Sequence, residues 1–227
     1  MDMSYLAAEE SLARAEAIAW DARDFDTLAR LYLPLQEARR QRRQRAGEGT
    51  FQLDLLPERP NDDWPNADAI AQSISQGQLL IAGWGSIAPA LRLRELARER
   101  QLYLDTFLAA VYPIDGGGRA VVIVPLEDVA LPDPHPRLID DLLPLLPPHS
   151  IALHENELPK GPRNGTWETY GQVMAIWERL HAPFLAAAEM QVDPVRRMEH
   201  YRKTIRVDYA CELAHQRLAE VAHAIKS

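Results

Sequence analysis

The spacing of apolar residues changes along this chain, and that change limits the folds it can adopt. Before residue 47 the apolar side chains recur every three or four positions, as they do along one face of a helix. Between 78 and 155 they gather in short continuous runs, which are typical of buried strands. From residue 166 onward the helical spacing returns. We therefore expect an α+β fold in which a small central sheet packs with an N-terminal helical hairpin and long C-terminal helices.

The central region predicts about four strands in the order β-α-β-β-α-β. Their apolar runs lie at 78–84, 102–112, 119–124 and 150–154, and helices are expected at 90–101 and 133–146. The segment 47–66 holds several prolines among acids and amides, so we expect a connector there.

Residues suited to capping mark the expected helix starts. Asp24 or Asp26 would cap the second N-terminal helix. Thr166 would cap the first C-terminal helix, which is expected to begin at residue 167. Asp193 and Pro194 would begin a last helix of roughly thirty residues, because proline is favoured in the first turn. That helix carries apolar residues on two faces, so we expect it to be buried on two sides, by the sheet and the N-terminal hairpin. The chain would then form a single integrated domain, 1–227, with subregions 1–47, 78–155 and 166–227.

The composition excludes several classes of protein. With 47% hydrophobic and 26% charged residues, the chain resembles an ordinary globular protein. The net charge of −8 argues against nucleic acid as a partner, and no apolar run is long enough to span a membrane. The start of the chain lacks the features of a signal peptide, so we expect a cytoplasmic protein. Cys211 is the only cysteine, which excludes an internal disulfide and a thiolate-based zinc site, and its apolar neighbours favour a buried side chain.

The run from Ala15 to Tyr32 resembles one tetratricopeptide-type helical hairpin. Small residues stand where the two helices would meet, and the hairpin that contains this run, 1–47, covers about a fifth of the chain. The sequence has no second copy at the period of ~34 residues that a tetratricopeptide array requires. The resemblance implies a peptide-binding role by analogy.

A glycine-containing turn is the first candidate site. Gly83, Trp84, Gly85, Ser86, Ile87 and Ala88 fit the pattern G-x-G-x-x-G/A between an expected strand and an expected helix. Such a turn lets a phosphate approach the backbone at a helix N-terminus, and Asp105 follows at about the spacing of a ribose-binding acid. Arg119 is a further candidate for this ligand. The bulk of Trp84 and the small number of strands favour the alternative, a structural turn capped by Ser86.

Two Glu-x-x-His pairs form the second candidate site, Glu178 with His181 and Glu212 with His215. A spacing of three places each pair on one helix face, as in the carboxylate-bridged metal sites of helical bundles. Two pairs are only a mild excess over chance, and a histidine near a helix end is also favoured by the helix dipole. Ordinary interhelical hydrogen bonding is therefore the stronger reading, and no cofactor is predicted.

The third candidate site is a basic run at the end of the second helix. Arginine occupies five of the seven positions from 39 to 45, and the candidates for an anion or partner surface are Arg39, Arg40, Arg42 and Arg43. Arginine suits bidentate contacts with acidic groups. The alternative is a solvated or internally paired helix face.

These observations favour a non-enzymatic protein-binding or scaffold module that contacts a protein partner or a second copy of itself. The first alternative is an enzyme or sensor that binds a nucleotide or sugar phosphate at the Gly83–Ser86 turn. The second is a metal-dependent protein that uses the Glu-x-x-His pairs.

Overall fold

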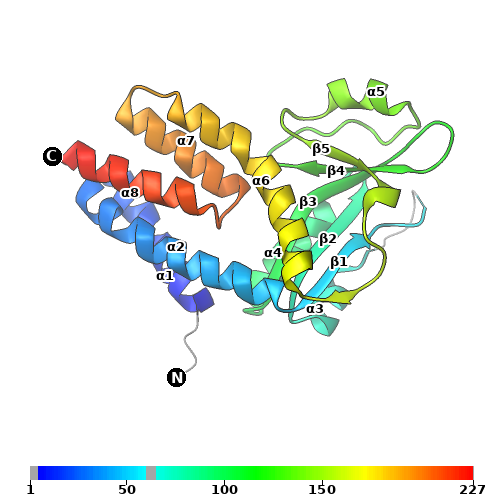
Figure 1. Cartoon of the computed structure of the whole chain (residues 1–227), viewed down its shortest axis with the longest axis horizontal. Helices are drawn as coiled ribbons and strands as arrows, with labels where there is room; N and C mark the ends of the chain where they lie inside the picture. The colour runs from blue at the N-terminus through cyan, green and yellow to red at the C-terminus, as the bar shows by residue number, and fades with distance from the viewer. Residues whose placement is uncertain (1–4, 60–64, 227) are drawn as a thin grey trace. The chain divides into compact units, whose positions relative to one another are not determined.

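The computed structural model describes residues 5–59 and 65–226, and the chain divides into two compact units (Figure 1). The helical unit consists of the chain up to Gln44 and from Trp177 onward, and the α/β unit consists of Arg45–Ile176. That the two units act as the single domain expected from the sequence stays a prediction. The first four residues and residues 60–64 of the expected connector lie outside the described residues.

The helical unit contains the expected N-terminal hairpin and C-terminal helices. Asp24 caps α2, because Thr27 donates its backbone N–H to Asp24 Oδ1 at 3.0 Å and its hydroxyl to Oδ2 at 2.6 Å. Small and apolar side chains of all five helices form its core, among them Ala19, Leu28 and Leu218. The helices are α1 (Tyr5–Asp21), α2 (Phe25–Gly47), the second half of α6 (Trp167–Glu189), α7 (Pro194–Val207) and α8 (Glu212–Lys226).

The expectation of one long last helix is wrong, because the chain leaves the helix at Asp208. This residue adopts an extended conformation, with φ −131° and ψ 97°. Its Oδ1 accepts a hydrogen bond from the backbone N–H of Ala210 at 3.1 Å. An aspartate side chain that binds a nearby backbone amide offers the chain an alternative to the helix. The apolar spacing continues on both sides of the break, so it gives no warning of it.

The α/β unit holds a six-stranded sheet in the order β5-β4-β3-β2-β1-β6, and not the expected four strands. Strands β1, β2 and β3 are parallel, while β4, β5 and β6 each run antiparallel to a neighbour. The four expected strands are β2 to β5. The two additional ones are β1, inside the expected connector, and β6, which is too short to show a pattern. The strands are β1 (Thr50–Leu55), β2 (Gln76–Trp84), β3 (Tyr103–Pro113), β4 (Arg119–Val124), β5 (Ile151–His154) and β6 (Arg163–Asn164).

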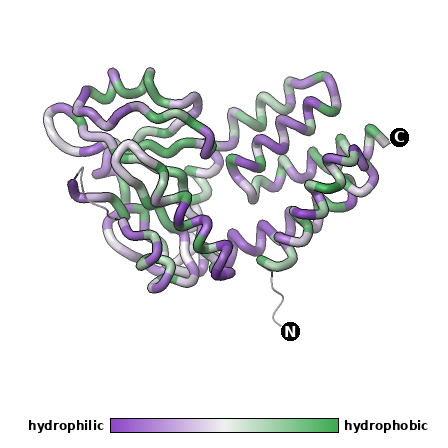
Figure 2. The backbone as a smooth tube through the Cα atoms, turned by 180° about the vertical axis from the view of Figure 1, so that it is seen from behind, coloured by the Kyte–Doolittle hydropathy of each residue, from purple (hydrophilic) through white to green (hydrophobic). Residues whose placement is uncertain are grey.

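Strands β2 and β3 lie at the centre of the sheet. They contain unbroken runs of seven and nine buried residues, as expected for strands covered on both faces. Helix α4 packs on β2 and β3, and α3 packs against α4. Figure 2 shows green stretches in the interior of this unit and helices that alternate between green and purple. The helices of this unit are α3 (Ala67–Ser73), α4 (Ala88–Glu99), α5 (Ile139–Leu142), the 3-10 helices η1 (Leu143–Leu145) and η2 (Glu155–Glu157), and the first half of α6.

No helix in the described part of the chain combines the length and apolar character that a membrane crossing requires.

Candidate functional site

The Gly83–Ser86 turn joins β2 to α4, as the sequence predicts, and it packs closely against prolines of the same chain. Gly85 has a positive φ of 54°, and a Cβ at this position would lie 2.9 Å from Pro134 Cδ. A Cβ on Gly83 would lie 3.2 Å from Pro89. Ser86 Oγ accepts a hydrogen bond from the backbone N–H of Ala88 at 3.2 Å. Phosphate binding at this turn stays a prediction.

Asp105 lies far from that turn along the sheet. It is buried near the start of β3 and pairs with Gln78, whereas Gly83 pairs with Ala110, five residues further along β3. At ~3.3 Å per residue, this separation is about 16 Å. The structure therefore does not bring Asp105 and the turn together.

Arg119 lies at the same end of the sheet as the turn, two strands away from it. It begins β4 opposite Pro113. Its guanidinium donates to Glu155, with 2.8 Å between Nε and Oε2, and to the carbonyl oxygen of Pro57. Its charge therefore helps to hold β4, η2 and the chain after β1 together.

In both Glu-x-x-His pairs the glutamate lies on the surface of the helical unit and the histidine points into its interior. Glu178 and Glu212 are exposed, and Glu212 accepts a hydrogen bond from Gln36 at 3.4 Å. His181 Nδ1 lies 2.7 Å from Asp208 Oδ2, while His215 is fully buried. Across residues 5–59 and 65–226, no group of three or more His, Cys, Asp or Glu is arranged to hold a metal ion.

Most of the basic run is turned inward. Arg39 and Arg42 share the carboxylate of Glu9, at 3.2 and 3.0 Å. Arg43 is 1% exposed and pairs with Asp208. Arg40 lies on the exposed side of α2, where it pairs with Glu37 at 2.9 Å. The alternative of an internally paired face therefore describes three of the four arginines.

Arg43 and Asp208 form the centre of a buried polar cluster. The guanidinium lies over the rings of Trp177 and Tyr209, 4.4 and 4.6 Å from their centroids, and its Nη2 is 2.9 Å from Asp208 Oδ1. Burial alone would raise the pKa of Asp208, but the charge of Arg43 and the hydrogen bond from His181 bring it below its usual range. Asp208 is therefore ionised at neutral pH.

The two histidines of this region differ in charge at neutral pH. Burial would lower the pKa of His181, but its hydrogen bonds to Asp208 and Cys211 outweigh burial and raise the pKa to about 10. Burial and the charge of Arg39 lower the pKa of His215 to about 4. A neutral His215 donates its Nδ1–H to the carbonyl oxygen of Cys211 at 2.8 Å and accepts from Arg39 at Nε2, at 3.1 Å. Both ring nitrogens of His215 are thus occupied by protein groups.

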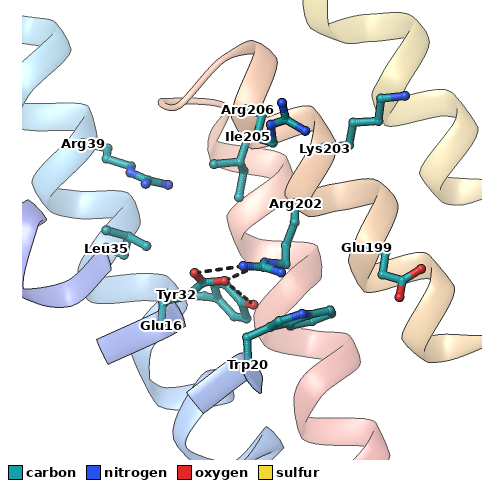
Figure 3. A pocket seen from close by; sticks show the side chains of 10 residues that line it. All are labelled: Glu16, Trp20, Tyr32, Leu35, Arg39, Glu199, Arg202, Lys203, Ile205 and Arg206. Atoms are coloured by element: carbon teal, nitrogen blue, oxygen red, sulfur yellow. Dashed lines mark hydrogen bonds and ion pairs between the residues drawn. The ribbon is translucent and has the colours of Figure 1, made fainter. Parts of the chain in front are cut away.

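Next to Arg39, the helical unit contains a pocket of about 550 Å³ between α1 and α2 on one side and α7 on the other (Figure 3). Arg39 lines it from α2 and the other cations line it from α7, where Lys203 extends away from α2 (Figure 3). The charged lining comprises four cations and two carboxylates, which gives a net charge of +2. These residues are Arg39, Arg202, Lys203, Arg206, Glu16 and Glu199.

One wall of the pocket is held in place by its own polar contacts. Arg202 lies 4.1 Å over the ring of Trp20 and donates from Nε to Glu16 Oε1 at 2.8 Å. Tyr32 donates its hydroxyl to the same oxygen at 3.2 Å. Burial and the charge of Glu16 raise the pKa of Tyr32, so the phenol remains a neutral donor. Figure 3 shows these four side chains grouped at the lower end of the pocket.

The rest of the pocket is more open. Lys203, Arg206 and Glu199 are exposed, and Lys203 Nζ lies 5.5 Å from the ring centroid of Phe184. Among the described residues that line the pocket, none is His, Cys, Ser or Thr, so its lining lacks the usual nucleophiles and the usual general base. The lining suits binding of an anionic group.

Apart from Arg39, the sequence analysis did not select the residues of this pocket. Two signals could have indicated them. Tyr32, Leu35, Arg39 and Arg43 share one helical stripe, which predicts that the basic run turns inward. Helix α7 contains five Lys or Arg and a single Glu in 14 residues.

The charge is also divided unevenly between the units. The helical unit has 15 Lys or Arg and 15 Asp or Glu, whereas the α/β unit has 10 and 18, so the entire net charge of −8 belongs to the α/β unit.

Comparisons of the chain with protein-family models, with curated proteins and with solved structures found no match. The pocket and the buried cluster beside it therefore carry the functional argument.

Proposed function

We propose that the chain is a non-enzymatic protein-binding module, and that the pocket of the helical unit receives an acidic segment of its protein partner. The observation that carries this proposal is a pocket with a net charge of +2 in a protein with a net charge of −8. Carboxylates are the natural ligands of arginine side chains, which can bind both oxygens at once.

The residue types of the pocket support a protein as the ligand. Trp and Arg are enriched among the residues that dominate protein–protein binding energies, and Trp20 and Arg202 lie together here beside the buried Tyr32. The half-buried Ile205 adds apolar surface between the charges, whereas Leu35 is 2% exposed. A partner segment that alternates acidic and apolar side chains would satisfy both parts of the lining.

The wall formed by Arg202, Glu16 and Tyr32 is ordered before any ligand arrives. Their contacts fix side chains that would otherwise lose rotamer freedom on binding, and such preorganisation favours affinity. Trp20 and Tyr32 also belong to the hairpin that resembles a tetratricopeptide unit. The analogy with that family's peptide-binding role points to the same part of the chain.

The test is a fluorescence anisotropy titration of the whole protein with a labelled peptide of alternating Glu and Leu. The control peptide has Lys in place of Glu. We expect binding of the acidic peptide only, weakened by added salt because exposed charges are screened. Lys203→Glu and Arg206→Glu should each weaken it by roughly tenfold, since each reverses one charge at the open side of the pocket.

Arg196→Glu is the matched control. Arg196 is exposed on the same helix but does not line the pocket, and a glutamate in the first helical turn is well tolerated. Equal losses in the Arg196 and Arg206 variants, or binding of both peptides, would contradict the proposal.

A further inference from the structure

The α/β unit presents a surface segment with the chemistry that the pocket requires. It runs from Leu138 to Leu145 through α5 and η1, and we call it the acidic leucine segment. Leu138, Leu143 and Leu145 are 56%, 46% and 53% exposed. Asp140 and Asp141 are exposed between them, which gives the segment a charge of −2. Three exposed leucines so close together are unusual on a protein surface that contacts only water.

The acidic leucine segment is held in a defined conformation. Leu142 is 1% exposed and belongs to the core of the α/β unit, so it anchors the segment from below. The chain closes its turns with the backbone hydrogen bonds from Asp141 and Leu142 to the carbonyl oxygen of Leu138, both at 3.1 Å. The exposed side chains therefore project from an anchored turn, and little order has to be gained on binding.

From this complementarity we infer that the partner is a second copy of this chain, whose acidic leucine segment enters the pocket of the helical unit. The segment and the charged lining of the pocket have charges of −2 and +2, and each combines its charges with apolar side chains. This inference rests on the proposed function, because it names the partner for the same pocket.

The contact is heterologous, since it joins two different surfaces. Each copy in a pair keeps one vacant pocket and one unused segment, so further copies add head to tail until a ring closes. A single eight-residue segment buries less area than the ~1,000 Å² of a stable interface. We therefore expect weak association, with a dissociation constant on the order of 100 µM.

The experiment is sedimentation velocity of the whole protein over a wide concentration range at low and high salt. The wild type should pass from monomers to larger species as its concentration rises, and salt should reverse this. Lys203→Glu with Arg206→Glu reverses the charge of the pocket, and Asp140→Lys with Asp141→Lys reverses the charge of the segment. Each double variant should remain monomeric, with association weakened at least tenfold.

Mixing the two double variants gives the sharpest result. The original segment (−2) of one variant fits the original pocket (+2) of the other, and the reversed segment (+2) fits the reversed pocket (−2), so the mixture should regain the association that each variant alone has lost. The control is Glu99→Lys with Glu168→Lys, which makes the same charge change at exposed sites of the α/β unit and should associate like the wild type.

Two outcomes would overturn the inference. A monomeric wild type at every concentration excludes a second copy as the partner, and the proposed function stands if the acidic peptide still binds. Failure of the mixed variants to pair, while the wild type associates, shows that copies meet through other surfaces. If the wild type neither binds the acidic peptide nor associates, both proposals are wrong.

Discussion

Replacing Asp208 by asparagine removes one negative charge from the interior of the helical unit and keeps the size of the side chain. Asp208 and Arg43 have side chains only 1% and 2% exposed, so neither charge can turn to water. Arg43 stays protonated without its partner, because guanidinium groups do not titrate in the accessible range. Breaking a buried ion pair from one side typically costs ~3–5 kcal/mol. We expect a loss in this range, because Arg43 keeps its buried charge without a negative partner. The asparagine oxygen can still accept a hydrogen bond from Arg43, which keeps the loss from being larger.

The same substitution should change the pH dependence of stability. The pKa of His181 is raised from 6.5 to about 10 in the folded protein by its hydrogen bonds to Asp208 and Cys211, which outweigh burial. A raised pKa stabilises the fold fully below about pH 6.5, and this stabilisation is lost as the pH rises toward 10. Without the carboxylate, His181 loses one of the two partners that raise its pKa, so this alkaline loss should become smaller in Asp208→Asn.

Urea unfolding between neutral and alkaline pH, followed by circular dichroism, measures both effects. Hydrogen exchange of peptides from α7 and α8 assigns the loss to the helical unit. Glu220→Gln breaks the exposed pair with Arg217 and serves as the control, with an expected change within ~0.5 kcal/mol. A loss below ~1 kcal/mol, or an unchanged alkaline slope, would refute the reasoning.

Two further predictions concern other parts of the chain. The pKa of His215 is lowered to about 4, so the stabilisation that neutral His215 gives the fold is present above about pH 6.5 and is lost as the pH falls through 4. In His215→Gln, the melting temperature should therefore vary less with pH on the acid side. An acid slope equal to that of the wild type would count against this. Gly85→Ala should destabilise the α/β unit by about 1–3 kcal/mol in urea, because the residue has a positive φ and its Cβ would meet Pro134; a neutral effect would mean that Pro134 moves aside freely.

Local patterns predicted the N-terminal hairpin and four of the six strands, and missed α3, the break between α7 and α8, and the strands β1 and β6. In β1 the buried side chains of Phe51, Leu53 and Leu55 alternate with more exposed ones, which is a strand pattern. The prolines that follow it made the whole stretch resemble a connector. The parallel pairing with β2 decides the outcome, and that partner lies beyond the reach of a local pattern.

The candidate sites show the same limit. Residue type predicted that the basic run would meet acidic groups, but sequence could not choose between an external ligand and Glu9 or Asp208. Arg43 and Asp208 are 165 positions apart, so their pairing depends on the whole fold. The break between α7 and α8 has a similar cause, because the side chain of Asp208 binds both Arg43 and the backbone of Ala210.

The helical unit is discontinuous in sequence, and this affects how the protein is made. Its first part ends at Gln44 and its second part begins at Trp177, so the ribosome completes the α/β unit in between. Arg39, Arg42 and Arg43 are synthesised before the α/β unit, whereas Asp208 and His215 are synthesised after it. The sheet can therefore fold on the nascent chain while α1 and α2 still lack the helices that complete their core. A stalled or shortened product would expose a half-formed helical hairpin, which makes this unit the more sensitive to premature termination.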